Sequence, residues 1–282
     1  MNSYNKSVAI KKGKGNQLVQ ILCIFANMTK GNNILDGFRL ALSGLQPDSK
    51  YSPVFEVTSI LLGTGIPVLS SEDKRWSTFI AEVEQFASKS YIPVIGFPAS
   101  LNRTDLFCET IALVEDTIIR QASMENNVAI GLKYMIDECT DNIIEHSKSE
   151  YGYISSAIDR GTNTIDICIA DKGITVLGSF QAKNDPDIIS DLEALQAANR
   201  GISTKNRPDA ENRGYGLATT KKMIVNGLGG SFAMISGSSV YILDERGGRF
   251  LDSSRSVKIA GTIIMMRIPY INKEFKYINY VE

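Results

Sequence analysis

The chain is poor in the residues from which metal and nucleophilic sites are usually built. His146 is the single histidine among 282 residues, so no histidine-rich metal centre can form, and no histidine outside the segment around His146 is present for a Ser-His-Asp hydrolase site. The cysteines are few, far apart and free of any CxxC pair: Cys23, Cys108, Cys139 and Cys168. This spacing argues against a zinc site or a disulfide framework and favours a reducing, cytoplasmic environment.

Excess charge and long apolar runs are also missing. With 30 basic and 31 acidic side chains, the balance provides no signal for nucleic-acid binding. The longest apolar run near the start, residues 18–28, is interrupted by Gln20 and is too short to span a bilayer. We interpret it as a buried strand, and the composition, 43% apolar and 22% charged, as that of a soluble globular protein with no membrane partner.

The length of the chain and its turn-rich segment near residue 100 favour two domains. We expect a flexible tail (1–16), a small α/β domain (17–97), a turn-rich joint (96–102), a larger domain (104–270) and a C-terminal tail (271–282). In the small domain the expected strands are 17–27, 52–62 and an edge strand 91–95 that contains Pro93, and the expected helices are 33–44 and 74–89. It has no cluster of catalytic residue types, so we assign it to regulation, partner binding or homodimerisation.

The larger domain alternates between the two kinds of periodicity. Helices are expected over 104–123, 126–147, 186–199 and 216–226, and strands over 151–158, 164–170, 230–236, 239–244 and 257–268. A polar stretch, 200–213, separates the last two helices. The pattern predicts an α/β fold in which a mixed sheet packs against helices.

The most informative segment is DECTDNIIEH, residues 137–146. Leu132, Ile136, Cys139 and Ile143 fall on one side of the expected helix, and Glu138, Asp141, Asn142 and Glu145 fall on an adjoining arc. No Lys or Arg lies between Lys133 and Lys148 to offset the repulsion between the carboxylates. The alternatives are a solvated helix surface and a face that meets a cation.

A Glu and an Asn four residues apart suit Mg²⁺, which takes few protein ligands and keeps several waters. Glu138 would then polarise a water beside the ion held by Asn142. Three further motifs lie downstream: Asp171-Lys172-Gly173 after an apolar strand, Arg213-Gly214-Tyr215-Gly216-Leu217 at the start of a helix, and Gly261-Thr262 in the last long strand.

In order and spacing, these four pieces resemble the N, G1, G2 and G3 boxes of the GHKL superfamily of ATP-binding domains. The resemblance covers roughly residues 104–270 and is similar in its first box to anti-sigma-like kinases and related stand-alone regulators. It implies a two-layer α/β sandwich, the Bergerat fold, that binds ATP and Mg²⁺.

The resemblance also implies roles for individual residues. Asp171 would accept a hydrogen bond from the adenine amino group, Thr262 would bond close to the base, and Gly173 would let the backbone approach it. The backbone at Gly214, Gly216 and Leu217 would bind phosphates at a helix N-terminus. Six bases and two acids lie between residues 200 and 222, and among them Lys205 and Arg213 are the leading candidates for the γ-phosphate.

The stretch between Asp171 and Gly214 corresponds to the ATP lid of the family, and it contains the family-like segment Gly201-Ile202-Ser203-Thr204. The chain departs from the family in one place, where Thr175 replaces the second glycine of DxGxG. Because a β-branched residue is stiff, we expect a less mobile lid hinge.

Three functions follow from the resemblance. The first is an ATP-dependent switch with slow hydrolysis, in which Glu138 is the catalytic base. The second is an anti-sigma-type serine/threonine kinase in which the same Glu138 accepts a proton from a partner's serine. The third is a non-hydrolysing nucleotide sensor that binds a partner protein. A conventional histidine kinase is excluded, because His146 lies in the acidic helix itself and is interpreted as a helix-end packing or capping residue.

Overall fold

The computed structural model describes residues 53–61, 63, 67–72, 74–99, 104–183, 187–202, 204, 215–252, 258–271 and 274–281. The tail expected over 1–16, the strand expected over 17–27 and the helix expected over 33–44 therefore lie outside the described residues.

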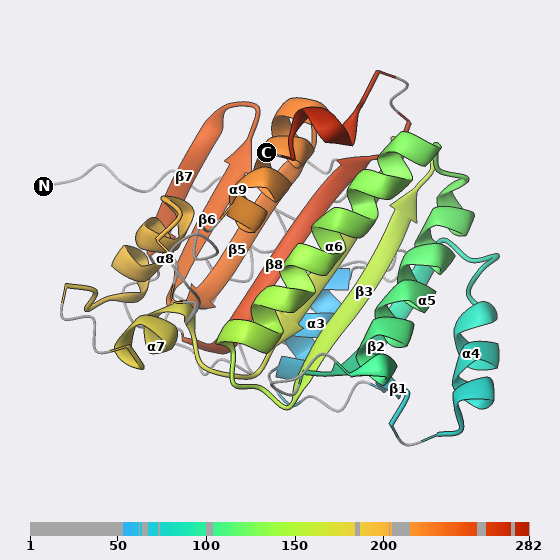
Figure 1. The fold of residues 1–282 in the computed structure, drawn as a ribbon, viewed down its shortest axis with the longest axis horizontal. Coiled ribbons are helices and arrows are strands. Elements are labelled where there is room, and N and C mark those ends of the chain that lie inside the picture. Colours follow the sequence, from blue (N-terminus) through green and yellow to red (C-terminus); the bar gives the residue numbers. More distant parts are fainter. Residues whose placement is uncertain are drawn as a thin grey trace, which may run out of the picture.

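One eight-stranded sheet runs through the described part of the chain, in the order β1-β2-β3-β4-β8-β5-β6-β7 (Figure 1). The strands are β1 (Leu69–Ser70), β2 (Tyr91–Pro98), β3 (Tyr151–Asp159), β4 (Thr164–Asp171), β5 (Ser231–Gly237), β6 (Ser239–Asp244), β7 (Gly247–Asp252) and β8 (Ile259–Pro269). β1 and β2 pair in parallel, and the other neighbours pair antiparallel. The expected mixed sheet is therefore confirmed.

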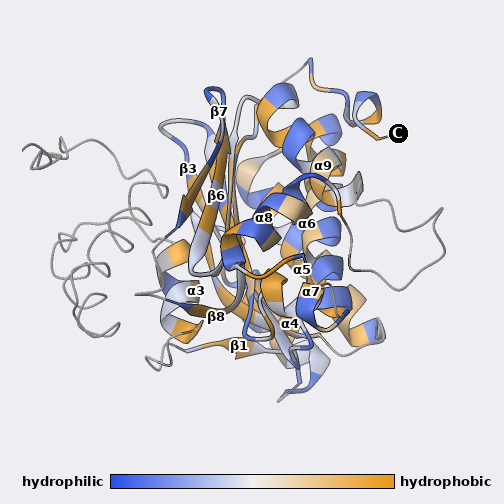
Figure 2. Cartoon of the chain, turned by 90° about the vertical axis from the view of Figure 1, so that its left-hand side faces the viewer, coloured by the Kyte–Doolittle hydropathy of each residue, from blue (hydrophilic) through white to orange (hydrophobic). Residues whose placement is uncertain are grey.

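Helices cover both faces of this sheet, unequally. The α-helices are α3 (Pro53–Leu61), α4 (Trp76–Glu84), α5 (Asp105–Ala122), α6 (Asn126–His146), α7 (Val176–Gln181), α8 (Asp191–Asn199) and α9 (Tyr215–Lys222), and α9 continues into a π-helical turn, Met223–Gly227. α4 to α9 lie on one face, whereas α3 lies on the other (Figures 1 and 2). The α/β class is confirmed, and α3 adds a partial third layer to the two that were expected.

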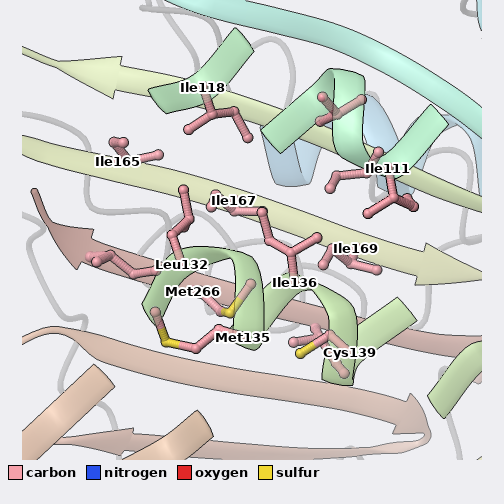
Figure 3. Close-up of a cluster of buried hydrophobic side chains, with 14 of the residues drawn as sticks. Ile111, Ile118, Leu132, Met135, Ile136, Cys139, Ile165, Ile167, Ile169 and Met266 are labelled. Atoms are coloured by element: carbon pink, nitrogen blue, oxygen red, sulfur yellow. The ribbon is translucent and has the colours of Figure 1, made fainter. Parts of the chain in front are cut away.

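The strands are apolar on both faces, which explains the two layers of packing. Ile165, Ile167 and Ile169 of β4 belong to the core under α5 and α6, and the intervening Cys168 belongs to a second core under α3. The apolar side of α6 packs into the first core, where Leu132, Ile136 and Cys139 are fully buried (Figure 3). The expected division of α6 into an apolar and an acidic side is confirmed.

The strand expected over 52–62 is wrong, because this segment is helix α3. Its β-branched residues are typical of a strand. However, Pro53 suits the first turn of a helix, and Val54, Val57 and Ile60 recur at helical spacing and are buried in the second core. Tertiary packing overrides the local propensity here.

The edge position expected for residues 91–95 is also wrong, because β2 lies between β1 and β3 and runs on to Pro98. Its register against β3 shifts between Ile92 and Ile95. Pro93 lies in this irregularity, where no ladder hydrogen bond from its nitrogen is required.

The described end of the expected N-terminal domain shares its sheet with the larger domain. β2 pairs with β3 over most of its length, and Phe97 of β2 stacks edge-on against Phe107 of α5. β2 therefore belongs to the same sheet as the strands of the larger domain.

The C-terminal tail expected from residue 271 packs against the domain. Phe275 is buried, and its ring occupies the space beside Gly131 of α6, where a side chain would collide with it. A short 3₁₀ turn, Tyr277–Asn279, follows. The described tail is thus part of the helical layer.

Candidate functional site

A pocket of about 920 Å³, including its open mouth, lies against the acidic side of α6. Its walls come from α6, the end of β4, α7, the end of α8 and the start of α9. The lining residues are Glu138, Cys139, Asn142, Ile143, His146, Ser147, Ile169, Asp171, Ile174, Thr175, Val176, Ser179, Phe180, Ala198, Gly201, Ile202, Thr204, Gly216, Leu217, Met234, Thr262 and Ile264. Mostly apolar walls with a few convergent polar groups are typical of a small-molecule site.

Helix α6 contributes Glu138 and Asn142, which follow each other at one helical turn along the pocket. Both are half-buried, and Cys139 and Ile143 beside them are buried. Asp141 and Glu145 do not line the pocket. Of the four polar residues on this side of α6, two therefore face the pocket.

Asp171 ends β4 at the floor of the pocket, and only 2% of its surface is exposed. Burial raises the pKa of this carboxyl to about 7, although the backbone N–H groups of Gly173 and Thr262 donate to it and oppose the shift. The Gly173 nitrogen lies 2.8 Å from Asp171 Oδ1. The carboxyl is thus held rigidly in an apolar site, with a pKa close to neutrality.

Strand β8 approaches Asp171 through Gly261 and Thr262. Gly261 has φ +77°, and a Cβ there would overlap the Asp171 backbone, so the position requires glycine. Thr262 lines the pocket, and its Oγ1 lies 3.1 Å from Ser236 Oγ. Ser236 Oγ also accepts a hydrogen bond from the Val176 N–H at 2.9 Å, which ties the start of α7 to the sheet.

Gly216, near the start of α9, lies directly against the Glu138 carboxylate. A Cβ on Gly216 would overlap that carboxylate, so any larger residue there requires the Glu138 side chain to move. On the other side of Glu138, Tyr134 has its pKa raised to about 12 by burial, then by the charge of Glu138 and by a hydrogen bond to it. The carboxylate therefore sits between α6 and the glycine of α9.

Gly173 does not line the pocket. Its close contact is with the end of α6, because a Cβ on Gly173 would overlap the Ser147 carbonyl. The next residue, Ile174, donates its N–H to the same carbonyl at 2.6 Å. The structure thus explains this glycine by the packing of two backbone segments.

Thr175 has a local role that a glycine could not fill. It is the N-cap of α7, where its Oγ1 accepts the Gly178 N–H at 3.1 Å, and its φ of −70° is open to any residue. Thr175 therefore fixes the start of the helix that forms one wall of the pocket.

The basic groups expected to meet the acidic helix are only partly described. Lys205, Arg213 and Gly214 lie outside the described residues. Lys221 is described but does not line the pocket: its ammonium lies 2.7 Å from Asn199 Oδ1 and 5.4 Å from the centre of the Tyr241 ring. Burial lowers its pKa to about 8.

Some lining residues were not expected from the sequence. His146 ends α6, as expected, but it also lines the pocket, and its Nδ1 lies 3.0 Å from Thr204 Oγ1. Ser179 and the apolar Ile174, Phe180 and Met234 were not expected either. A single Ser or apolar residue forms no motif that a sequence could reveal. Thr204, by contrast, could have been predicted, because the segment Gly201-Ile202-Ser203-Thr204 resembles a sequence found in the GHKL family.

The described residues contain no group of three or more His, Cys, Asp or Glu side chains able to hold a metal by themselves. The donor beside Glu138 is the amide of Asn142, a neutral oxygen ligand. Such a set fits Mg²⁺ only where phosphates and water complete its coordination. Among the described helices, none is long and apolar enough to cross a bilayer.

Comparison of the chain with protein-family models, curated proteins and solved structures gave no match.

Proposed function

We propose that the protein is a Mg-ATP-binding regulatory ATPase of the GHKL type, with a Bergerat-like domain that acts as a nucleotide-dependent switch. One observation carries the proposal: Glu138, Asn142, Asp171, Gly216, Leu217 and Thr262 line a single pocket. These residues come from α6, β4, α9 and β8, which lie far apart in the sequence. A shared pocket is what the four motifs require if they bind one ligand.

The chemistry of the lining supports a purine nucleotide as this ligand. Asp171 is a buried acceptor, flanked by apolar surface from Ile169, Met234 and Ile264 that suits a planar base. At the other end, Asn142 would share Mg²⁺ with the phosphates, and Glu138 would orient and deprotonate the attacking water. Backbone N–H groups near Gly216 would bind the phosphates.

The binding test measures ATP affinity by calorimetry, with and without Mg²⁺. We expect Asn142→Ala to abolish the Mg²⁺ dependence and Asp171→Ala to lower affinity more than about tenfold, the loss of one buried polar contact or more. Asn127→Ala is the matched control, because Asn127 is exposed on the same helix. Unchanged affinity in both site variants would contradict the proposal.

Turnover is tested separately with Glu138→Ala, which should bind ATP and hydrolyse it at least about a hundredfold more slowly, as expected for loss of a general base. Glu109→Ala, an exposed position on α5, is the control. Hydrolysis by Glu138→Ala at the wild-type rate would contradict the role of Glu138 as the general base. Transfer of labelled γ-phosphate to a serine of a partner protein would instead support the second function, an anti-sigma-type serine/threonine kinase.

A further inference from the structure

Three polar side chains from separate elements form a continuous chain at the wall of the pocket. His146 Nδ1, at the end of α6, lies 3.0 Å from Thr204 Oγ1. Thr204 Oγ1 lies 2.6 Å from Ser179 Oγ, on α7. All three residues line the pocket.

The chain can form with either tautomer of the imidazole. A hydroxyl has one proton and two lone pairs, so Thr204 can donate to Nδ1 while it accepts from Ser179. With a proton on Nδ1, the direction reverses: the imidazole donates to Thr204, and Thr204 donates to Ser179. Thr204 is therefore held by two hydrogen bonds in both cases.

Thr204 follows the end of α8, and the rest of α8 is already attached to the domain. At its start, the Ser238 N–H and hydroxyl donate to Asp191 Oδ2 at 3.0 and 3.2 Å. At its end, Lys221 of α9 donates to Asn199 Oδ1 at 2.7 Å. Just beyond α8, Thr204 contacts the end of α6 through His146.

We propose that His146 and Ser179 are positioning residues that hold Thr204 against the bound nucleotide and so slow its release. The proposal rests on the proposed nucleotide site and adds a determinant of residence time to it. Gly201 and Ile202 line the pocket just before Thr204, so the position of Thr204 decides how closely this wall approaches the ligand. In this role His146 positions Thr204 through a hydrogen bond and does not act as a phosphate acceptor.

The test is stopped-flow release of a fluorescent ATP analogue in Mg²⁺ from the full chain. Thr204→Val keeps the size and branching of the side chain and removes the hydroxyl. We expect release to be about 3- to 10-fold faster, the worth of one or two net hydrogen bonds, with an unchanged association rate. Thr162→Val is the matched control, because Thr162 is exposed in the β3–β4 turn and its hydroxyl bonds that of Thr164, away from the pocket.

A double-mutant cycle separates this role from simple loss of structure. His146→Leu and Thr204→Val should each speed release, and the double variant should release no faster than the faster single variant, because one chain is broken in all three. Ser179→Ala provides a second route to the same loss should His146→Leu fold poorly. Equal thermal midpoints of Thr204→Val and wild type would locate the effect in the pocket.

The outcomes are distinguishable from failure of the nucleotide site itself. Wild-type protein that binds the analogue, with Thr204→Val and Ser179→Ala releasing it at the wild-type rate, overturns the positioning role alone. Additive effects of His146→Leu and Thr204→Val overturn it as well. Wild-type protein that does not bind the analogue overturns the proposed site and, with it, this inference.

Discussion

The two walls of the pocket are held in different ways. The wall made by α6 and β4 is backed by the main core, where Leu132, Ile136 and Ile167 are fully buried. The other wall, made by α7 and α8, is backed by a smaller cluster of four buried residues, Leu177, Phe180, Ala194 and Ala197, and it also joins the main core through Leu195 of α8 and Val176 of α7. Side-chain hydrogen bonds, such as those from Ser238 to Asp191 and from Lys221 to Asn199, add to this apolar packing.

This difference in packing implies that one wall of the pocket is more rigid than the other. Apolar burial in a large contiguous core resists local opening, whereas a wall backed mainly by a smaller cluster opens at lower free energy. The groups with proposed chemistry, Glu138, Asn142 and Asp171, all belong to the first wall. We therefore expect a ligand to displace the second wall more readily than the first.

The largest contrast should appear when each wall loses a buried side chain. Ile136→Ala in α6 should lower the free energy of unfolding by about 3–4 kcal/mol, because the main core cannot collapse around the cavity. Leu177→Ala in α7 should cost about 1–2 kcal/mol, because its cluster is small and 8% of Leu177 is already exposed. Urea denaturation measures both, and equal costs would contradict the contrast between the walls.

The free energy of unfolding should depend on pH through Asp171, which lies in the first wall. The pKa of Asp171 is raised from 3.8 to about 7, so the folded protein binds the extra proton. Stability from this group is fully present below about pH 4 and is lost as the pH rises to about 7, by on the order of 4 kcal/mol at most. Asp171→Asn should lack this loss. Identical pH profiles of unfolding in both proteins would exclude the buried carboxyl as its source.

The contact between α9 and the first wall should be sensitive to a single methyl group. Gly216→Ala must displace Glu138, so ATP affinity should fall about tenfold, or about 1.4 kcal/mol. Combining it with Glu138→Ala removes the overlap and should restore most of the affinity, though not turnover. Wild-type affinity in Gly216→Ala, measured by calorimetry, would refute the steric account.

The smallest effect concerns the cap of the second wall. Thr175→Ala removes the acceptor for the Gly178 N–H and should cost about 1 kcal/mol, whereas Thr175→Ser should cost little. Hydrogen exchange of the α7 amides measures this locally. Faster exchange confined to α7 in Thr175→Ala would show that this cap stabilises the second wall. Unchanged exchange in both variants would show that Thr175 does not contribute to the stability of this wall.

The sequence predicted the first wall far better than the second. Helix α6, the division of its faces and the strand before Asp171 follow from apolar periodicity over long segments. By contrast, α7 was not expected, because six residues carry too little periodicity. For α8, the expected start at residue 186 was early; Ser190 and Glu193 form a capping box that places it at Asp191.

Similar physical reasons explain the other differences. β7 begins with two glycines and is largely exposed, so it has no apolar alternation to detect. The helix α3 was mistaken for a strand because its Val and Ile residues are buried by the sheet, a contact that local propensity cannot report. Short and tertiary-dependent elements were therefore the ones missed.

By itself, the sequence determined an α/β protein with a long acidic helix, and the resemblance of its motifs to the GHKL boxes singled out Glu138, Asn142, Asp171, Gly216 and Thr262. These features depend on neighbours along the chain, where helical and strand periods can be read directly. Only the tertiary structure decided that the five line one pocket and that His146, Ser179 and Thr204 meet at its wall. The contact of Thr204 with His146 alone joins residues 58 positions apart, and only the folded packing of the sheet and helices brings them together.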